Sequence, residues 1–267
     1  MTDITVTGGE PFRVGACLSK CISTFFSNFI SLNILGLIIL IPGAILVYLL
    51  FGGILTSLIS WAETNTELPS DMVVPIITTV FGILFIMIAW QYLVTGAVVY
   101  SVVQYLNGDK SSPFASLAQM LRRFVPVVLV AIISTILVWI GMMLLIVPGI
   151  IVALMLCVAI PVVMAEGPGV MASLSRSREL TKGARWKLLG LFLVAGIGIT
   201  IVSELLSFIV ELAVPLSETG AIIQFAVEMV LQVIFTVFMA VVLAVTYHDL
   251  RVAKEGVSAS QIAAVFD

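Results

Sequence analysis

EGPGVMASLSRSRELTKGARWK, residues 166–187, is the longest polar interruption in the apolar second half of the chain. It contains five basic residues and no apolar run. Basic residues close to the ends of membrane spans are retained on the cytoplasmic side. The side on which this stretch lies therefore fixes the direction of every span before and after it.

The composition of the 267 residues predicts that lipid is the main solvent. Hydrophobic residues make up 61% of the chain and charged residues only 10%, whereas about a quarter of an ordinary soluble domain is charged. Backbone groups in a bilayer must bond within the protein, so spanning segments are helices or a closed barrel. The apolar runs are long and do not alternate with polar residues, which predicts helices.

A span needs about 20 apolar residues, and six runs satisfy this requirement or come close to it. They predict an all-α bundle of six transmembrane helices in one domain, with polar tails at residues 1–10 and 248–267. Pro42-Gly43 falls inside the first run, as a kink or a re-entrant break, and Pro148-Gly149 is expected to form the turn between the third and fourth. The predicted spans are residues 29–60, 74–106, 124–147, 150–165, 188–213 and 220–247.

Short amphipathic segments precede three pairs of spans. In residues 11–25, one helical face carries the apolar residues, which predicts a helix lying at the membrane interface or the polar start of the first span. Similar segments begin at Pro113 and Pro168. LIILIPGAIL at 37–46 also echoes MLLIVPGIIV at 143–152. Three parallel two-helix repeats would explain this order, and similarity of apolar composition is the alternative. The apolar face of the first segment consists of Val14, Leu18, Cys21, Ile22 and Phe25.

The distribution of charge predicts the orientation. All 12 Lys and Arg residues lie on one side of the six predicted spans, and the opposite loops carry acids without a base. We therefore expect a membrane protein with both termini in the cytoplasm. A turn at Pro42 would add a crossing and invert the rest of the chain, so one span is expected there.

Three stretches resemble a known family. PVVMAEG ends at Gly167, LSRSRELTKG ends at Gly183 and YHDLRVAKEG ends at Gly256. In this order they resemble the membrane domain associated with bacterial glycerophosphoryl diester phosphodiesterases, which also occurs free-standing in six-span proteins. In the complete enzymes catalysis belongs to a soluble barrel domain with no counterpart in this sequence. The resemblance therefore implies a membrane unit and carries no activity with it.

The basic residues of these stretches are a candidate site for lipid phosphates or for a cytoplasmic protein. The alternative is that they are retained on the positive side and pair with acids such as Asp249 and Glu255. The candidate residues are Arg176, Arg178, Lys182, Arg185 and Arg251.

Two acids lie within predicted spans at similar depth, Glu204 in the fifth and Glu228 in the sixth. Gln224 and Gln232 share a helical face with Glu228, at spacings of four residues. An ionisable group at the centre of a span costs about 2.5–3.5 kcal/mol on insertion scales, so these acids need a reason. One reason is a pathway for protons or cations. The other is a protonated carboxyl bonded to a glutamine or to Ser203, in a dry helix contact.

Other chemistry has little support in the sequence. The chain has one His and no glycine-rich phosphate loop, so we expect no catalytic, metal or cofactor site. Cys17, Cys21 and Cys157 are expected to be buried small residues, with acylation or redox pairing as alternatives. We expect a non-enzymatic protein that contacts the bilayer and no nucleic acid, in a structural or accessory role in envelope or lipid homeostasis. The alternative is a small transporter or channel that uses Glu204 and Glu228.

Overall fold

The computed structural model describes residues 12–64, 73–109, 112–214 and 217–256. Throughout these ranges the regular structure is helical, which confirms the predicted all-α fold. The helices are α1 (Val14–Ser27), α2 (Phe29–Thr64), α3 (Val73–Leu106), α4 (Pro113–Arg122), α5 (Phe124–Leu144), α6 (Ile146–Leu156), α7 (Ala159–Ala165), α8 (Val170–Thr181), α9 (Arg185–Ala213) and α10 (Glu218–Glu255).

Six stretches of this structure are long and apolar enough to cross a membrane, as the sequence predicts. Three short helices, α1, α4 and α8, each precede a pair of them. This order fits the proposed three-part organisation of the chain. The spanning stretches are Phe29–Gly53, Val73–Leu106, Phe124–Leu144, Ile146–Ala165, Arg185–Ala213 and Ile223–Glu255.

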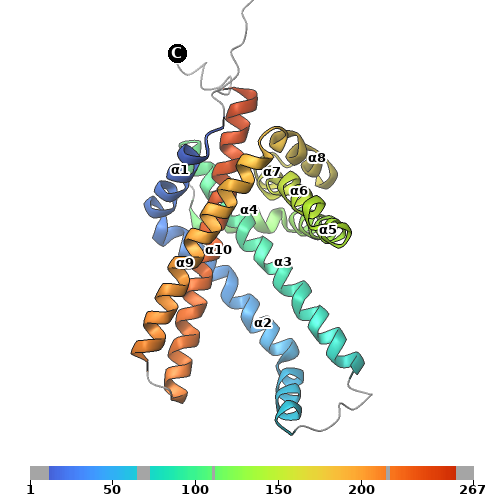
Figure 1. The fold of residues 1–267 in the computed structure, drawn as a ribbon, viewed down its shortest axis with the longest axis vertical. Helices are drawn as coiled ribbons and strands as arrows, with labels where there is room; N and C mark the ends of the chain where they lie inside the picture. Colours follow the sequence, from blue (N-terminus) through green and yellow to red (C-terminus); the bar gives the residue numbers. More distant parts are fainter. Residues whose placement is uncertain (1–11, 65–72, 110–111, 215–216, 257–267) are drawn as a thin grey trace, which may run out of the picture.

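Tight packing is confined to one end of the molecule. α3 is buried from Leu93 to Val99, and α10 is largely buried from Val233 onward. From this end two arms diverge in Figure 1. We call α2 beyond Leu40 with α3 before Trp90 the first arm, and α9 beyond Ala195 with α10 before Val233 the second arm. Apolar side chains of both arms are mostly exposed, as expected of surfaces that face lipid.

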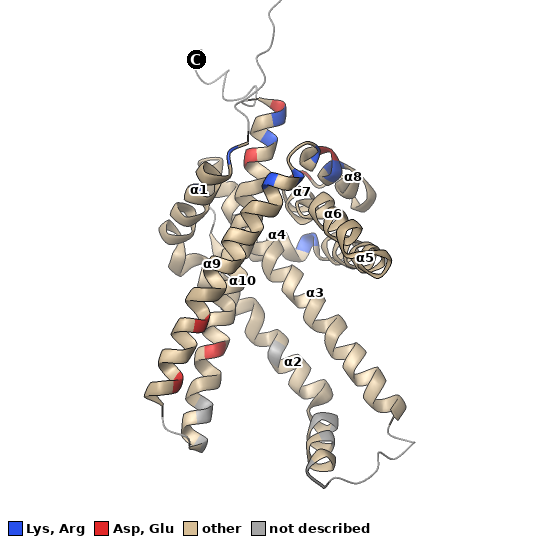
Figure 2. Cartoon of the chain, viewed as in Figure 1, with Lys and Arg blue, Asp and Glu red and all other residues tan. Residues whose placement is uncertain are grey.

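The packed end is also the basic end. Figure 2 shows the Lys and Arg residues of the described chain gathered around α1, α4, α8, the start of α9 and the last turns of α10. In the same view the second arm carries acids, and neither arm shows a base. We use the term basic end for this part of the molecule. Its position agrees with the charge asymmetry of the sequence.

Pro42 lies inside a continuous helix, so α2 is one element and does not turn back. A proline lacks the N–H that bonds the carbonyl four residues earlier, and its ring disturbs that turn. Trp90 of α3 donates its indole N–H to the Ile39 carbonyl in this turn. A Cβ at Gly43 would overlap the same indole. Gly43 and the Ile39 carbonyl are therefore the docking point for Trp90. Figure 1 shows the main bend of α2 nearer its far end.

The turn of the second hairpin differs from the prediction. It lies at Leu145, between α5 and α6, and Pro148-Gly149 belongs to the first turns of α6. Proline is tolerated there because the first N–H groups of a helix have no intrahelical acceptor. Gly149 is needed for the close approach of α5, since a Cβ at this position would lie 2.7 Å from the backbone nitrogen of Met142. α5 and α6 are strongly foreshortened in Figure 1, so the hairpin runs across the direction of α9 and α10.

Two further features differ from the prediction: the buried face of α1 and the end of the last helix. α1 buries Cys17, Cys21, Thr24 and Phe25, whereas Ile22 is 43% exposed. The face is rotated because α1 packs against α10, with the Phe25 and Phe238 ring centroids 5.3 Å apart. The last helix continues beyond the predicted end of the sixth span at residue 247 and into the predicted polar tail: α10 ends at Glu255, before Gly256 at φ 78°. The first ten residues and residues 257–267 lie outside the described structure.

Candidate functional site

Glu204 and Glu228 line the same pocket, as their similar depth in the sequence suggests. α9 supplies one wall and α10 the other, and the pocket has a volume of about 360 Å³. Both glutamate side chains are exposed to it. Hydroxyl and amide groups line the remainder together with two apolar residues. The full lining is Thr200, Ser203, Glu204, Ser207, Glu228, Leu231, Gln232 and Phe235.

Neither carboxylate has a protein partner within the described ranges. No hydrogen bond or ion pair joins Glu204 or Glu228 to another described residue. Gln224, predicted to share their face, does not line the pocket, whereas Gln232 and Ser203 do. At membrane depth an unpaired carboxylate requires water, a proton or a cation to offset its charge. The pocket has room for each of these.

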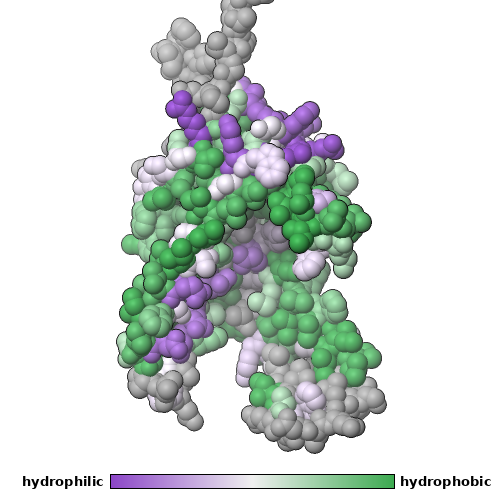
Figure 3. All heavy atoms as spheres, viewed as in Figure 1, coloured by the Kyte–Doolittle hydropathy of each residue, from purple (hydrophilic) through white to green (hydrophobic). Residues whose placement is uncertain are grey.

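Gln232 connects this pocket to a second one of about 300 Å³ between α2, α3 and α10. Gln91 of α3 lines the second pocket and donates to the Thr236 hydroxyl of α10, at 3.3 Å. Figure 3 shows the result as a hydrophilic band that crosses the second arm and continues into the hollow between the arms. The polar groups of three helices, α3, α9 and α10, thus form one connected system.

Glu211 extends the polar face of α9, and the sequence analysis missed it. It is exposed, and it follows Glu204 by seven residues and Ser207 by four. Residues at these spacings share one face of a helix. The seven-residue spacing was the signal that could have identified it. Glu211 does not line the pocket, which makes it a natural comparison for the two acids that do.

A second polar cluster lies at the basic end, where the three family-like stretches meet. The Tyr247 hydroxyl of α10 donates to Glu166 Oε1 at 2.8 Å, and the tyrosine is only 1% exposed. Arg176 Nε of α8 donates to Glu166 Oε2 at 3.3 Å, and its guanidinium also pairs with Glu255. Arg251 Nε donates to Glu255 at 3.0 Å. Residues 81 positions apart in the chain are thereby joined.

Gly167, next to Glu166, has a steric reason to be glycine. Its φ is +67°, in the left-handed region that other residues rarely adopt. A Cβ there would also overlap the guanidinium of Arg123, which donates to the Val163 carbonyl. In the first family-like stretch, Glu166 therefore belongs to the polar cluster, and Gly167 leaves room for the Arg123 side chain beside it.

α1 joins the basic end through a salt bridge and a thiol pair. Lys20 Nζ lies 2.7 Å from Asp249 Oδ1, and His248 Nδ1 lies 3.3 Å from the same oxygen. Cys17 and Cys21 are buried free thiols. The neighbouring Cys17 thiol and burial raise the pKa of Cys21 above its usual range. A raised thiol pKa keeps Cys21 protonated, which disfavours acylation or oxidation there.

The structure divides the five predicted basic residues into two groups. Arg176 and Arg251 are paired with acids. Arg178 and Lys182 are exposed and have no acidic partner among the described residues. Arg185 is half-buried, and its Nε is shielded from solvent without a hydrogen-bond acceptor in the described chain.

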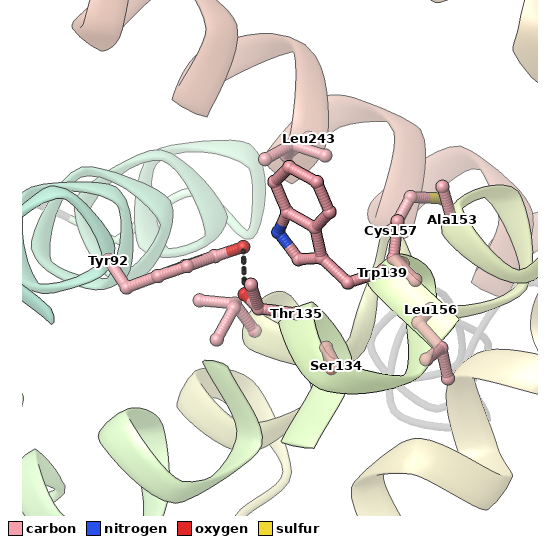
Figure 4. A pocket seen from close by; sticks show the side chains of 10 residues that line it. Tyr92, Ser134, Thr135, Trp139, Ala153, Leu156, Cys157 and Leu243 are labelled. Atoms are coloured by element: carbon pink, nitrogen blue, oxygen red, sulfur yellow. Dashed lines mark hydrogen bonds between the residues drawn. The ribbon is translucent and has the colours of Figure 1, made fainter. Parts of the chain in front are cut away.

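A third pocket, of about 330 Å³, lies among α3, α5, α6, α7 and α10 (Figure 4). Tyr92 and Thr135 approach each other across it, with their hydroxyl oxygens 3.4 Å apart. The Trp139 ring projects over the pocket, and Cys157 donates its thiol to the Leu154 carbonyl at 3.2 Å. Its lining carries hydroxyl groups and no charged side chain. It is therefore less suited to an ion than the pocket of Glu204 and Glu228.

Nowhere in the described ranges do three His, Cys, Asp or Glu side chains come together as a metal-binding group. Comparison of the chain with protein families, with curated proteins and with solved structures gives no significant match.

Proposed function

We propose that this multi-pass membrane protein is a small transporter or channel for protons or inorganic cations, with Glu204 and Glu228 as its binding groups. The observation that carries the proposal is their position in one open pocket between α9 and α10, without a protein partner in the described chain. Acids within spans mark ion and proton pathways because their insertion is costly.

The chemistry of the pocket supports a cation over an anion. Its polar groups are oxygens of carboxylates, hydroxyls and an amide, which are the ligands that hard cations prefer. No Lys or Arg lines it. A carboxylate can also carry the proton itself, so that the two glutamates would alternate between charged and neutral forms. Gln232 then offers the next polar group toward the hollow between the arms.

The same proposal places the protein in a bacterial cytoplasmic membrane. The basic end would face the cytoplasm, together with both termini, because Lys and Arg are retained there. The glutamate pocket would then lie in the half of the membrane away from the cytoplasm, since Glu204 and Glu228 belong to the second arm. We propose no enzymatic activity for the chain.

The accessory role remains a second candidate, and the polar cluster at the basic end favours it. Glu166, Arg176, Tyr247 and Glu255 come from the three stretches that resemble the membrane domain of bacterial glycerophosphoryl diester phosphodiesterases, and they are bonded to one another. A rigid joint of this kind would suit a membrane unit that supports lipid homeostasis without transporting an ion.

Flux measurements in liposomes test the transport proposal. The purified chain is reconstituted, and the uptake of protons, Na⁺, K⁺ and Mg²⁺ is followed separately with ion-sensitive dyes under an imposed potential. At least one ion should cross faster than in protein-free liposomes. Glu204→Gln and Glu228→Gln should each reduce that flux to the protein-free rate, because the neutral amide cannot offset a cation or carry the proton.

Glu211→Gln is the matched control, because it removes an exposed acid from the same face of α9 outside the pocket. Its flux should equal that of the unaltered chain. Absence of flux for all four ions, or equal loss in the three variants, would refute the proposal and favour the accessory role.

A further inference from the structure

Positive charges from three helices meet at the basic end, and the described residues around them do not supply enough negative charge to balance them. Lys182 follows α8, Arg185 begins α9 and Lys254 lies in the last turn of α10. The positively charged neighbours of Lys254 include Lys182 and Arg185, together with Arg176. Like charges held together raise the free energy of the fold unless an anion joins them.

The nearby acids do not remove this imbalance. Glu166 and Glu255 pair with Arg176, and Glu255 also bonds Arg251. Glu179 is the acid that acts on Lys254. Its backbone carbonyl accepts from both the Lys254 ammonium and the Lys182 N–H, an arrangement favoured at the carboxyl end of a helix. Of the acids named here, only Glu179 is left to offset the charges of Lys182, Arg185 and Lys254.

Arg185 gives an independent sign of a missing acceptor. Its Nε is buried and has no hydrogen-bond partner within the described chain. A buried donor without an acceptor is costly, and native structures rarely retain one. Trp186, the next residue, is 73% exposed. Exposed tryptophans at the end of a span are typical of the headgroup level of a membrane.

From these observations we infer that Lys182, Arg185 and Lys254 bind a phosphate group, carried by an anionic lipid headgroup. A guanidinium and two ammonium groups supply charge-assisted hydrogen bonds to phosphate oxygens. This set differs from the one predicted from the sequence, because Arg176 and Arg251 are already neutralised and Lys254 replaces them. The inference does not depend on the proposed transport activity.

The test measures the thermal unfolding midpoint of the purified full chain in micelles that contain phosphatidylcholine. Phosphatidylglycerol is then added in steps, and inorganic phosphate is titrated in a parallel series. The midpoint should rise with phosphatidylglycerol. In the double variant Lys182→Gln with Lys254→Gln the apparent affinity should fall by more than tenfold, because each cation near an anionic headgroup is worth about a fivefold change.

Arg122→Gln is the control, because it removes an exposed base of α4 outside the cluster. It should leave the lipid-dependent rise unchanged. In phosphatidylcholine alone the double variant should be at least as stable as the unaltered chain, because two repelling charges have been removed. If this variant is unstable there, the lysines serve the fold and the inference is wrong.

The remaining outcomes also decide the question. A rise with phosphatidylglycerol that inorganic phosphate does not reproduce supports a lipid as the source of the phosphate. An equal rise with inorganic phosphate retains the phosphate site and assigns it to the free ion. An equal response to added phosphatidylcholine and phosphatidylglycerol, or a rise that persists in the double variant, would overturn the inference.

Discussion

Tyr247 shows how much a single side chain contributes at the basic end. Its ring is buried and its hydroxyl reaches Glu166, which is fixed from the other side by Arg176. The sequence assigned these three residues to the three family-like stretches. It did not show which acid each base would meet, because long side chains from several helices reach the same depth and only packing selects among them.

Tyr247→Phe should destabilise the protein by about 2 kcal/mol, because a hydrogen bond to a charged group contributes about 1.5–3 kcal/mol. The measurement is the thermal unfolding midpoint in detergent. Tyr105→Phe removes a hydroxyl from an exposed tyrosine and should leave the midpoint unchanged. Equal midpoints for the two variants would show that the bond to Glu166 contributes nothing to stability.

At the scale of the helix, length and hydropathy were sufficient to predict the six spans. They could not place the second hairpin turn, because an apolar run that contains a turn has the same composition as one that does not. Pro148 suggested the turn, but proline is also common in the first turn of a helix. Composition also could not fix the buried face of α1. The helix packs against α10, and the residues that it buries include two cysteines and a threonine as well as an aromatic residue.

Gly43 should tolerate substitution poorly, although it lies in a helix where alanine is normally preferred. Gly43→Ala would force the Trp90 indole away from the Ile39 carbonyl and separate α2 from α3. We expect a loss of about 1–3 kcal/mol from the displaced contact, measured by thermal unfolding. Gly53→Ala is the matched control in the same helix, where nothing lies within 4 Å of the added carbon. Equal behaviour of the two variants would contradict this account of the Pro-Gly pair.

For the whole molecule, the charge pattern was the most informative part of the sequence. It predicted one basic end, and the described Lys and Arg residues do gather there (Figure 2). The pocket of Glu204 and Glu228 was predicted only in part. Equal depth suggested that the two acids meet, but hydropathy does not indicate whether two helices close on each other or leave a space. The divergence of the arms was not predicted for the same reason.

The orientation can be tested by thiol labelling in intact cells. The three native cysteines are replaced, and single cysteines are introduced as Arg178→Cys at the basic end and Thr219→Cys at the far end of α10. A membrane-impermeant maleimide should label position 219 directly and position 178 only after permeabilisation, since basic residues are retained inside. The reverse pattern would invert the molecule in the membrane.

The divergence of the two arms has a mechanical consequence. The free part of α9 continues beyond Ala195 to Ala213 and is therefore about 27 Å long. A rigid rod of that length, pivoting at its packed end, acts as a lever: a rotation of about 5° displaces its tip by about 2 Å. Small repacking around Tyr247 and Glu166 would thus be amplified at the opposite face of the membrane. Movement observed at the tips should be traced to the pivot, where the contacts that set the angle are made.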